Sequence, residues 1–279
     1  MRPEDPLFIY EIEGRFQIPP EGLGRDFIAH WKEGESHFLF FSREQEERIK
    51  DILKGQPDAL WIRSHTLIYR DWQGGESFDG VSIGKFLFLP PWIPVPQKSE
   101  GLPLRLDSGV VFGSGSHPTT RDSLLALQWV YEQDRPRKVL DLGCGTGILS
   151  LAACALGAEE VLAVDVNPAC VRTAEKNARL NEMENKIRVR EGQAEDFVQE
   201  PADLVLANLH FAVIRELIGR RAFWARKWLI LSGLLRSEYR EIRSRLQTMG
   251  FVVFEEWDAD FTWFTLAGGV RDSKDSEKG

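Results

Sequence analysis

Apolar and polar positions along the chain follow a regular rhythm after about residue 137. Short apolar runs alternate there with segments that carry apolar residues at helical spacing and often end at glycine. Strands are expected at 138–142, 161–165, 187–190, 204–207, 228–231, 251–256 and 262–266. Helices are expected at 148–156, 168–180, 213–220 and 237–249. Because no helix separates the last two strands, the pattern predicts a doubly wound, mostly parallel α/β sheet with one antiparallel edge strand.

The first part of the chain has shorter and more mixed elements. Strands are expected at 8–13, 36–41, 59–62 and 66–69, with a helix at 44–54. Prolines 90, 91, 94 and 96 exclude a helix interior or a central strand and indicate an extended connector. We therefore expect a small α+β domain over 1–88, a proline-rich linker over 89–103, a second domain over 104–270 and a charged tail over 271–279.

Composition narrows this picture mainly by exclusion. The chain has 279 residues, 43% hydrophobic and 28% charged, which is typical of a globular protein and excludes a disordered chain, a collagen and a coiled coil. No apolar run approaches the roughly 20 residues of a membrane span, and the polar N-terminus is not a secretory signal. We expect a cytoplasmic protein with no membrane partner. Cys144, Cys154 and Cys170 lack CxxC spacing, so neither a disulfide framework nor a metal site is expected.

The charge balance bears on possible partners. The net charge is −8, and residues 1–100 hold 17 acidic and 12 basic side chains. Neither part of the chain is basic, so direct binding to nucleic acid is not expected. The acidic surface is explained by solubility alone, or by docking of a cationic partner.

The strongest chemical signal is a glycine-rich turn between an expected strand and an expected helix, Asp141-Leu-Gly143-Cys-Gly145-Thr-Gly147. Glycines at such a turn let a ligand approach the backbone and the helix N–H groups. The G-x-G-x-G spacing differs from the dinucleotide fingerprint G-x-G-x-x-G. The Asp141 carboxylate would repel a pyrophosphate but could pair with an ammonium group. The turn therefore indicates S-adenosylmethionine, with Asp141, Gly143 and Gly145 as candidate contacts; the alternative is a turn that only packs helix on strand.

Two polar residues at the ends of later strands support a ligand site. Asp165 ends the second strand of the rhythm, where acidic side chains of doubly wound folds accept hydrogen bonds from ribose hydroxyls. Asn208 follows strand 204–207, at the sheet edge where substrate would meet cofactor. Enzymes that methylate planar amide or base nitrogens usually carry Asn-Pro-Pro-aromatic here, and this chain has Asn208-Leu-His210-Phe. His210 is either a base or a residue with a surface or packing role.

A second glycine loop, Phe112-Gly-Ser-Gly-Ser-His-Pro-Thr-Thr120, lies directly before an expected helix at 121–131. One interpretation is that Thr119 caps this helix, with Asp122 three residues on. The other is that the loop folds over the bound cofactor, with Thr120 in contact with it.

These segments, in this order, resemble the ribosomal protein L11 methyltransferase family. The likeness covers most of 85–266 and is densest in FGSGSHPTT (112–120), VLDLGCGTG (139–147), VLAVDVNP (161–168) and DLVLANL (203–209). It implies a Rossmann-like seven-stranded methyltransferase domain behind a small ferredoxin-like domain that recognises L11. It also implies that Thr120, Gly143, Asp165 and Asn208 contact S-adenosylmethionine.

The resemblance and the motifs together predict an S-adenosylmethionine-dependent protein N-methyltransferase. We expect methyl transfer to lysine side chains of L11, with the N-terminal amine as a further acceptor. Asn208 is the expected catalytic residue, since its carbonyl oxygen could orient the amine, and no general base is evident. The alternatives are another lysine-bearing protein, such as an electron-transfer flavoprotein subunit, a small-molecule amine, or a non-catalytic cofactor-binding module. A nicotinamide oxidoreductase is disfavoured by the glycine spacing.

Overall fold

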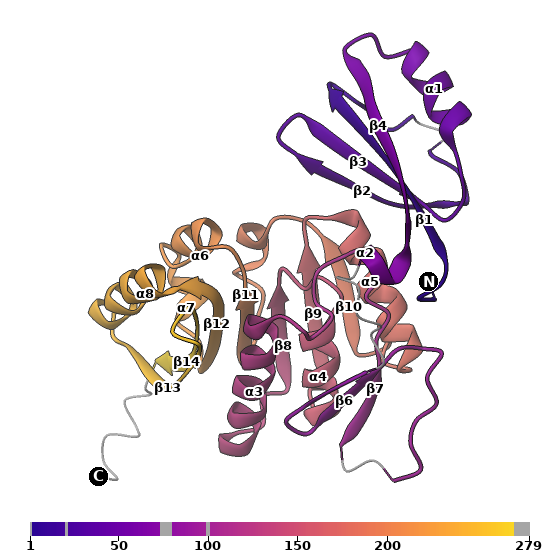
Figure 1. The fold of residues 1–279 in the computed structure, drawn as a ribbon. Coiled ribbons are helices and arrows are strands. Elements are labelled where there is room, and N and C mark those ends of the chain that lie inside the picture. The colour runs from indigo at the N-terminus through magenta and orange to yellow at the C-terminus, as the bar shows by residue number, and fades with distance from the viewer. Residues whose placement is uncertain (1, 20–21, 73–79, 99–100, 271–279) are drawn as a thin grey trace, which may run out of the picture. The chain divides into compact units, whose positions relative to one another are not determined.

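The computed structural model describes residues 2–19, 22–72, 80–98 and 101–270, which form two compact units (Figure 1). The first unit ends at Asp79 and the second begins at Gly80. The sequence assigned residues 80–88 to the first domain, whereas here they belong to the second unit. They do so because β5 (Val81–Ile83) and β6 (Phe86–Leu89) form a small sheet with β7 (Leu102–Arg105). The expected tail at 271–279 lies outside the described residues.

The N-terminal unit is an antiparallel sheet with one long helix. Its strands are β1 (Pro6–Gly14), β2 (Phe27–Glu33), β3 (Ser36–Phe41) and β4 (Ala59–Ile68), in the order β2-β3-β1-β4. Helix α1 (Glu46–Lys54) buries Ile49 in a core with Tyr10, Leu39 and Phe41, and the short α2 (Tyr69–Trp72) follows β4. The small α+β domain expected from the sequence is confirmed.

Three details of this unit differ from expectation. Strand β2 was missed because Phe27–Glu33 mixes apolar and charged residues without strict alternation. The expected strands 59–62 and 66–69 are one strand, because the polar residues between them keep pairing with β1 across a bulge. A ferredoxin-like element order has a helix between its first two strands. The described residues between β1 and β2 form none.

The second unit is built on a seven-stranded sheet, which confirms the expected Rossmann-like α/β fold. Its strands are β8 (Lys138–Leu142), β9 (Glu160–Asp165), β10 (Ile187–Glu191), β11 (Leu204–Asn208), β12 (Trp228–Leu235), β13 (Phe251–Ala259) and β14 (Trp263–Val270). They lie in the order β10-β9-β8-β11-β12-β14-β13. The antiparallel strand is β14, not the edge strand β13, because β14 turns back from β13 and pairs with β12 as well.

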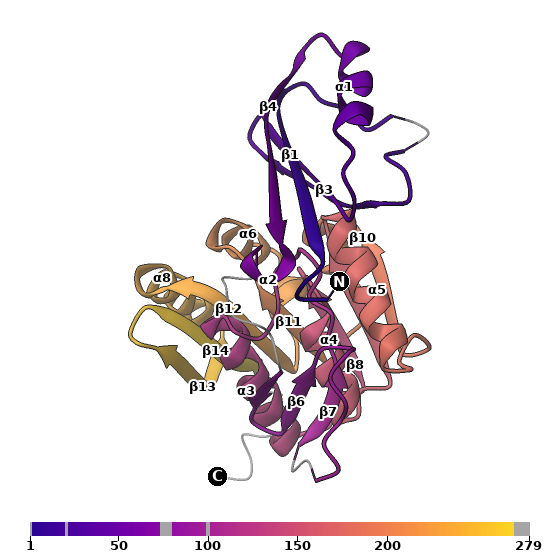
Figure 2. The same cartoon turned by 45° about the vertical axis from the view of Figure 1, so that its right-hand side comes forward.

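Helices cover both faces of this sheet (Figures 1 and 2). One face carries α3 (Pro118–Gln133), α4 (Ile148–Leu156) and α5 (Pro168–Leu180). The other carries α6 (Phe211–Leu217), α7 (Arg221–Trp224) and α8 (Arg236–Thr248), which share one apolar core with the sheet. The expected helix at 213–220 is α6, which begins two residues earlier and ends at Leu217, and α7 follows it as a separate helix. Within the described ranges, no helix has both the length and the apolar character needed to cross a membrane.

Two histidines form a stacked pair in the N-terminal unit. The rings of His30 and His37 are 5.0 Å apart, and His30 Nε2 lies 2.8 Å from His37 Nδ1. His37 Nε2 lies 3.1 Å from the carbonyl oxygen of Gly14, which can only accept, so His37 donates there and accepts at Nδ1. Burial, assisted by the proximity of His37, lowers the pKa of His30 to about 4. The pair is therefore stable as two neutral imidazoles.

This pair predicts acid sensitivity of the N-terminal unit. Because the pKa of His30 is lower in the folded state than its ordinary value of 6.5, its stabilising effect is complete above pH 6.5 and declines as the pH falls toward 4. Because His30 is only partly buried, solvent screening should keep the loss well below the roughly 3 kcal/mol that 1.36 kcal/mol per pKa unit would give. Hydrogen exchange of β1–β4 amides between pH 7 and 4 measures it. A His30→Gln variant, which does not titrate, should show a flatter dependence; an NMR titration of His30 centred at pH 6.5 would contradict the idea.

Candidate active site

A cavity of about 420 Å³ opens at the carboxyl ends of the parallel strands. Each strand contributes a residue to its wall: Gly143 after β8, Asp165 at the end of β9, Gly192 after β10, Asn208 at the end of β11 and Gly233 in β12. The strand order reverses between β8 and β11, and doubly wound sheets bind ligands in the crevice outside such a reversal. The cavity is therefore where the fold itself predicts a ligand.

The turn from β8 into α4 adopts a shape that favours glycine. Gly143 has φ +72°, and a Cβ there would lie 2.2 Å from the Leu209 side chain. Gly145 has φ +54°, and a Cβ there would lie 2.6 Å from the carbonyl oxygen of Phe112. The Gly143 N–H donates to the Val164 carbonyl at 2.8 Å, which fastens the turn to β9. The missing side chains let Leu209 and Phe112 pack directly against this turn, which forms one wall of the cavity.

Asp165 joins this turn to the end of β9. Its Oδ2 accepts a hydrogen bond from the Gly145 N–H at 2.9 Å, and its Oδ1 accepts one from the Asn167 N–H at 2.9 Å. Asn167 caps α5 by accepting from the Ala169 N–H at 2.9 Å. Each carboxylate oxygen retains capacity for a second hydrogen bond, and the partly exposed side chain lines the cavity. Asp165 can thus receive a pair of hydroxyl groups.

Two expected cofactor contacts lie behind the cavity wall. Asp141 is buried in β8 and accepts a hydrogen bond from the Ser150 hydroxyl at 2.6 Å. Burial raises the pKa of Asp141 to about 6, opposed by the Ser150 hydrogen bond and assisted by the charge of Asp165. Asp141 therefore anchors α4 to β8 and does not itself line the cavity. Thr120 is also buried, and its neighbour Thr119 lines the cavity instead.

The side chains around Asn208 make up the rest of the cavity. His117 caps α3 by accepting from the Thr119 N–H, so the expected cap at Thr119 is wrong. His210 lines the cavity at its surface, where its side chain is exposed. Cys170 also lines the cavity, but burial raises the pKa of its thiol, which disfavours a nucleophilic thiolate.

Sequence reasoning missed several wall residues. Gly192, Gln193 and Glu195 follow β10 directly, and Trp263 begins β14. The signal for the first three was available, because every parallel strand of a doubly wound sheet ends at the same edge. Trp263 had no such signal, since it reaches the cavity only through the antiparallel pairing of β14 with β12.

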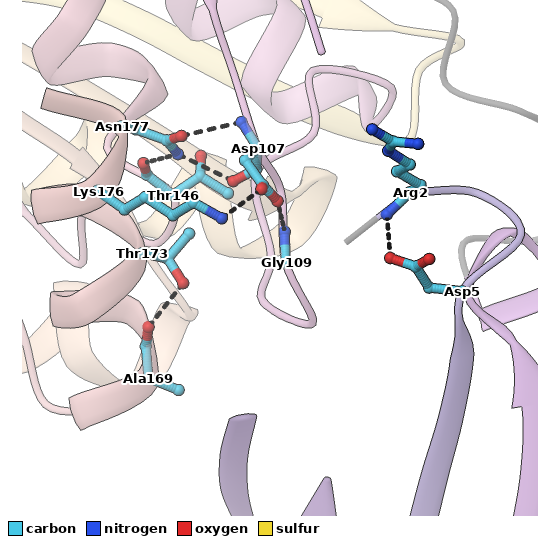
Figure 3. A network of polar contacts seen from close by, with 9 residues as sticks. All are labelled: Arg2, Asp5, Asp107, Gly109, Thr146, Ala169, Thr173, Lys176 and Asn177. Carbon is cyan, nitrogen blue, oxygen red and sulfur yellow. Dashed lines mark hydrogen bonds and ion pairs between the residues drawn. The ribbon is translucent and has the colours of Figure 1, made fainter. Parts of the chain in front are cut away.

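A buried asparagine of α5 holds the segment that leads into the second glycine loop (Figure 3). Asn177 Oδ1 accepts from the Asp107 N–H at 2.9 Å, and its Nδ2 donates to the carbonyls of Asp107 at 3.0 Å and Thr146 at 2.9 Å. The Lys176 ammonium also lies 2.5 Å from the Asp107 carboxylate. One turn later, Asn181 pairs in the same way with the backbone of Arg105, through two hydrogen bonds of 2.7 Å.

Thr146 connects the two glycine loops. Its hydroxyl donates to the Gly113 carbonyl at 2.7 Å, and its N–H donates to the Phe112 carbonyl at 3.1 Å. Since Asn177 holds the carbonyl of the same Thr146, one buried side chain on α5 supports both loops at once. The loop at 112–117 therefore packs against the turn after β8.

Comparison with known proteins decides the family. Residues 35–270 match the family described as ribosomal protein L11 methyltransferase (PrmA). The chain belongs to this family. It is 34% identical over 230 residues to the ribosomal protein L11 methyltransferase of Desulfitobacterium hafniense, a match that covers 80% of this chain and 72% of that one. The Prochlorococcus marinus protein of the same name is 34% identical over 255 residues, with 86% and 83% covered.

A solved structure agrees with this assignment. The crystal structure of the ribosomal protein L11 methylase of Lactobacillus delbrueckii subsp. bulgaricus is 26% identical and has a TM-score of 0.58. The match covers 69% of this chain and 99% of that one. Family members are S-adenosylmethionine-dependent methyltransferases, so the enzyme class and the cofactor predicted from the sequence are confirmed. The glycine cradle at Gly143 and Gly145 and the free acceptor capacity of Asp165 fit a ligand with a ribose diol.

Replacing Asp165 should weaken cofactor binding severely. The variant Asp165→Ala removes the proposed acceptor for the ribose hydroxyls and the hydrogen bond to Gly145. We expect the Kd for S-adenosylmethionine, measured by calorimetry, to rise about 10- to 1000-fold, because each charged hydrogen bond contributes roughly 1.5–3 kcal/mol. Glu160→Ala, at the other end of the same strand, is the matched control and should bind normally. An unchanged Kd for Asp165→Ala would refute the ribose assignment.

Replacing Asn177 should release the loop segment. Asn177→Leu leaves the N–H and carbonyl of Asp107 and the carbonyl of Thr146 without this partner. We expect a loss of about 2–4 kcal/mol in the free energy of unfolding and weaker cofactor binding, since buried unpaired groups are costly. Asn177→Asp retains the acceptor for the Asp107 N–H but directs a carboxylate oxygen at the Asp107 and Thr146 carbonyls in a buried site, so urea denaturation should show a comparable loss. Equal stability of Asn177→Leu and the parent would show that the network does not support the loops.

Proposed function

We propose that this protein transfers methyl groups from S-adenosylmethionine to lysine side chains of ribosomal protein L11, with the N-terminal amine of L11 as a further acceptor. The observation that carries the proposal is the convergence of Gly143, Asp165 and Asn208 on one cavity in a chain of this family. We assign the cofactor to the wall of Gly143, Gly145 and Asp165, and the acceptor amine to the wall beside Asn208 and Thr119.

The residues of the cavity suit methyl transfer to an amine. The bound cofactor supplies an electrophilic methyl group on a sulfonium. A lysine must approach as the neutral amine, because only that form has a free lone pair. Apolar side chains of Phe112, Leu209, Val213 and Trp263 line the cavity and disfavour the charged ammonium form. The chain's own contribution is therefore to exclude water and to position the reactants, and no general base is required.

We assign recognition of L11 to the N-terminal unit. This unit has its own hydrophobic core. The excess of acidic side chains in residues 1–100 suits a lysine-bearing partner. We also propose a cytoplasmic location, in keeping with a ribosomal substrate and with three cysteines that are all buried and free.

Incubation of the full chain with purified L11 and methyl-labelled cofactor tests this function. We expect label on L11, with mass spectrometry showing methylated lysines. A parallel incubation with extract from cells that lack this protein identifies competing substrates. Label on another protein with none on L11 would favour the alternative of a different lysine-bearing protein. Cofactor binding without transfer to any protein would favour a non-catalytic module.

A further inference from the structure

The polar side chains next to Asn208 form a short hydrogen-bonded chain. Asn208 Nδ2 lies 3.3 Å from Thr119 Oγ1, and Thr119 Oγ1 lies 2.8 Å from His117 Nδ1. The Thr119 backbone N–H lies 3.3 Å from the same His117 nitrogen. Asn208, Thr119 and His117 all line the cavity, so the chain runs along the wall that we assign to the acceptor.

The Thr119 backbone N–H can only donate, and this fixes which group donates and which accepts in each hydrogen bond of the chain. His117 Nδ1 therefore accepts, and the ring proton resides on Nε2. Burial lowers the pKa of His117, which favours this neutral form. The Thr119 hydroxyl then donates to His117 and accepts from the Asn208 amide NH₂. If the amide were reversed, Asn208 Oδ1 would face the Thr119 hydroxyl oxygen. The proton of that hydroxyl already takes part in the hydrogen bond to His117.

The space beside the amide oxygen is kept open by a glycine. A Cβ on Gly233 would lie 3.1 Å from Asn208 Oδ1 and 2.6 Å from the carbonyl oxygen of Leu209. Gly233 also has φ +86° and lines the cavity. The amide oxygen is therefore accessible on the cavity side, while the amide NH₂ is occupied by Thr119.

The imidazole at the far end of the chain is itself held in place. Phe112 and Trp263 each pack edge-on against the ring of His117, with centroid distances of 5.3 Å in both cases. The ring therefore cannot rotate without displacing two aromatic side chains of the cavity wall. The orientation of Asn208 is thus coupled to His117, although His117 precedes α3 and Asn208 ends β11.

We infer that Thr119 and His117 are positioning residues that hold the Asn208 carbonyl oxygen toward the cavity, where it accepts a hydrogen bond from the acceptor amine. The inference rests on the proposed function, because it requires an amine acceptor. An N–H of the neutral amine donates to Asn208 Oδ1, and this directs the nitrogen lone pair away from Asn208 and into the cavity. Gly233 provides the room for that contact.

The variant Thr119→Val tests the inference, because it removes the hydroxyl and keeps the shape. We expect kcat for methyl transfer to L11 to fall about 10- to 100-fold, as for a misoriented reactant. The Kd for S-adenosylmethionine, measured by calorimetry, should change by less than about threefold, because the cofactor wall is untouched. Thr119→Ser, which retains the hydroxyl, should recover most of the activity.

Thr265→Val is the matched control. Thr265 is as buried as Thr119, and its hydroxyl is hydrogen-bonded to Ser232 at 2.6 Å without contacting Asn208. We expect its kcat to stay close to that of the parent. An equal loss of kcat in Thr265→Val and Thr119→Val would overturn the inference, since it would mean that packing alone accounts for the effect.

A double-mutant cycle with Asn208→Ala separates the remaining outcomes. If Thr119 acts through Asn208, then Thr119→Val should reduce kcat little further in the Asn208→Ala background. Independent, multiplicative losses would overturn the inference while leaving the proposed function intact. A parent enzyme that binds the cofactor and leaves L11 unmethylated would overturn the proposed function itself, and this inference with it.

Discussion

Four other segments of the second unit are attached to the turn from β8 into α4. Its backbone N–H groups are held by the Val164 carbonyl and the Asp165 carboxylate of β9, and its carbonyl at Thr146 is held by Asn177 of α5. The loop at 112–117 packs on it through Thr146, and the end of β11 reaches it through Leu209. A Cβ at Gly143 or Gly145 would displace one of these neighbours, so the glycines fix the distances between four separate segments.

This dependence explains which parts of the site were predictable. Gly143, Asp165 and Asn208 each stand at the end of an apolar strand, and parallel strands bring their carboxyl ends to one edge. The arrangement therefore follows from local periodicity plus one rule of topology. Asn177 gave no such signal, because its partners at Asp107 and Thr146 are 70 and 31 residues away in sequence. In the sequence of α5, Asn177 looks like an ordinary polar residue of a helix. Only the folded chain shows that its side chain is fully buried.

Two expected contact residues, Thr120 and Asp141, do not line the cavity, and each has a specific cause. Thr119 and Thr120 differ by about 100° around the axis of α3, so the choice between them depends on where the helix begins. The structure begins it at Pro118 with His117 as the cap, which turns Thr119 toward the cavity and Thr120 into the core. Asp141 was expected to face a ligand because it precedes the glycines. It lies inside β8, buried between neighbouring strands, and its charge is directed to Ser150 of α4.

The two walls of the cavity differ in charge: one carries carboxylates and the other carries neutral polar groups. Among the described residues that line it, the acidic ones are Asp165 at the end of β9 and Glu195 in the 3₁₀ helix Ala194–Phe197 that follows β10. The wall beside β11 carries the Asn208 amide, the Thr119 hydroxyl and an imidazole whose pKa burial lowers. A lysine entering beside these neutral groups loses hydration and finds no carboxylate there to retain its proton, so the neutral amine is favoured. Because the amide oxygen of Asn208 has a fixed direction, the proposed acceptor wall both favours the neutral amine and orients it.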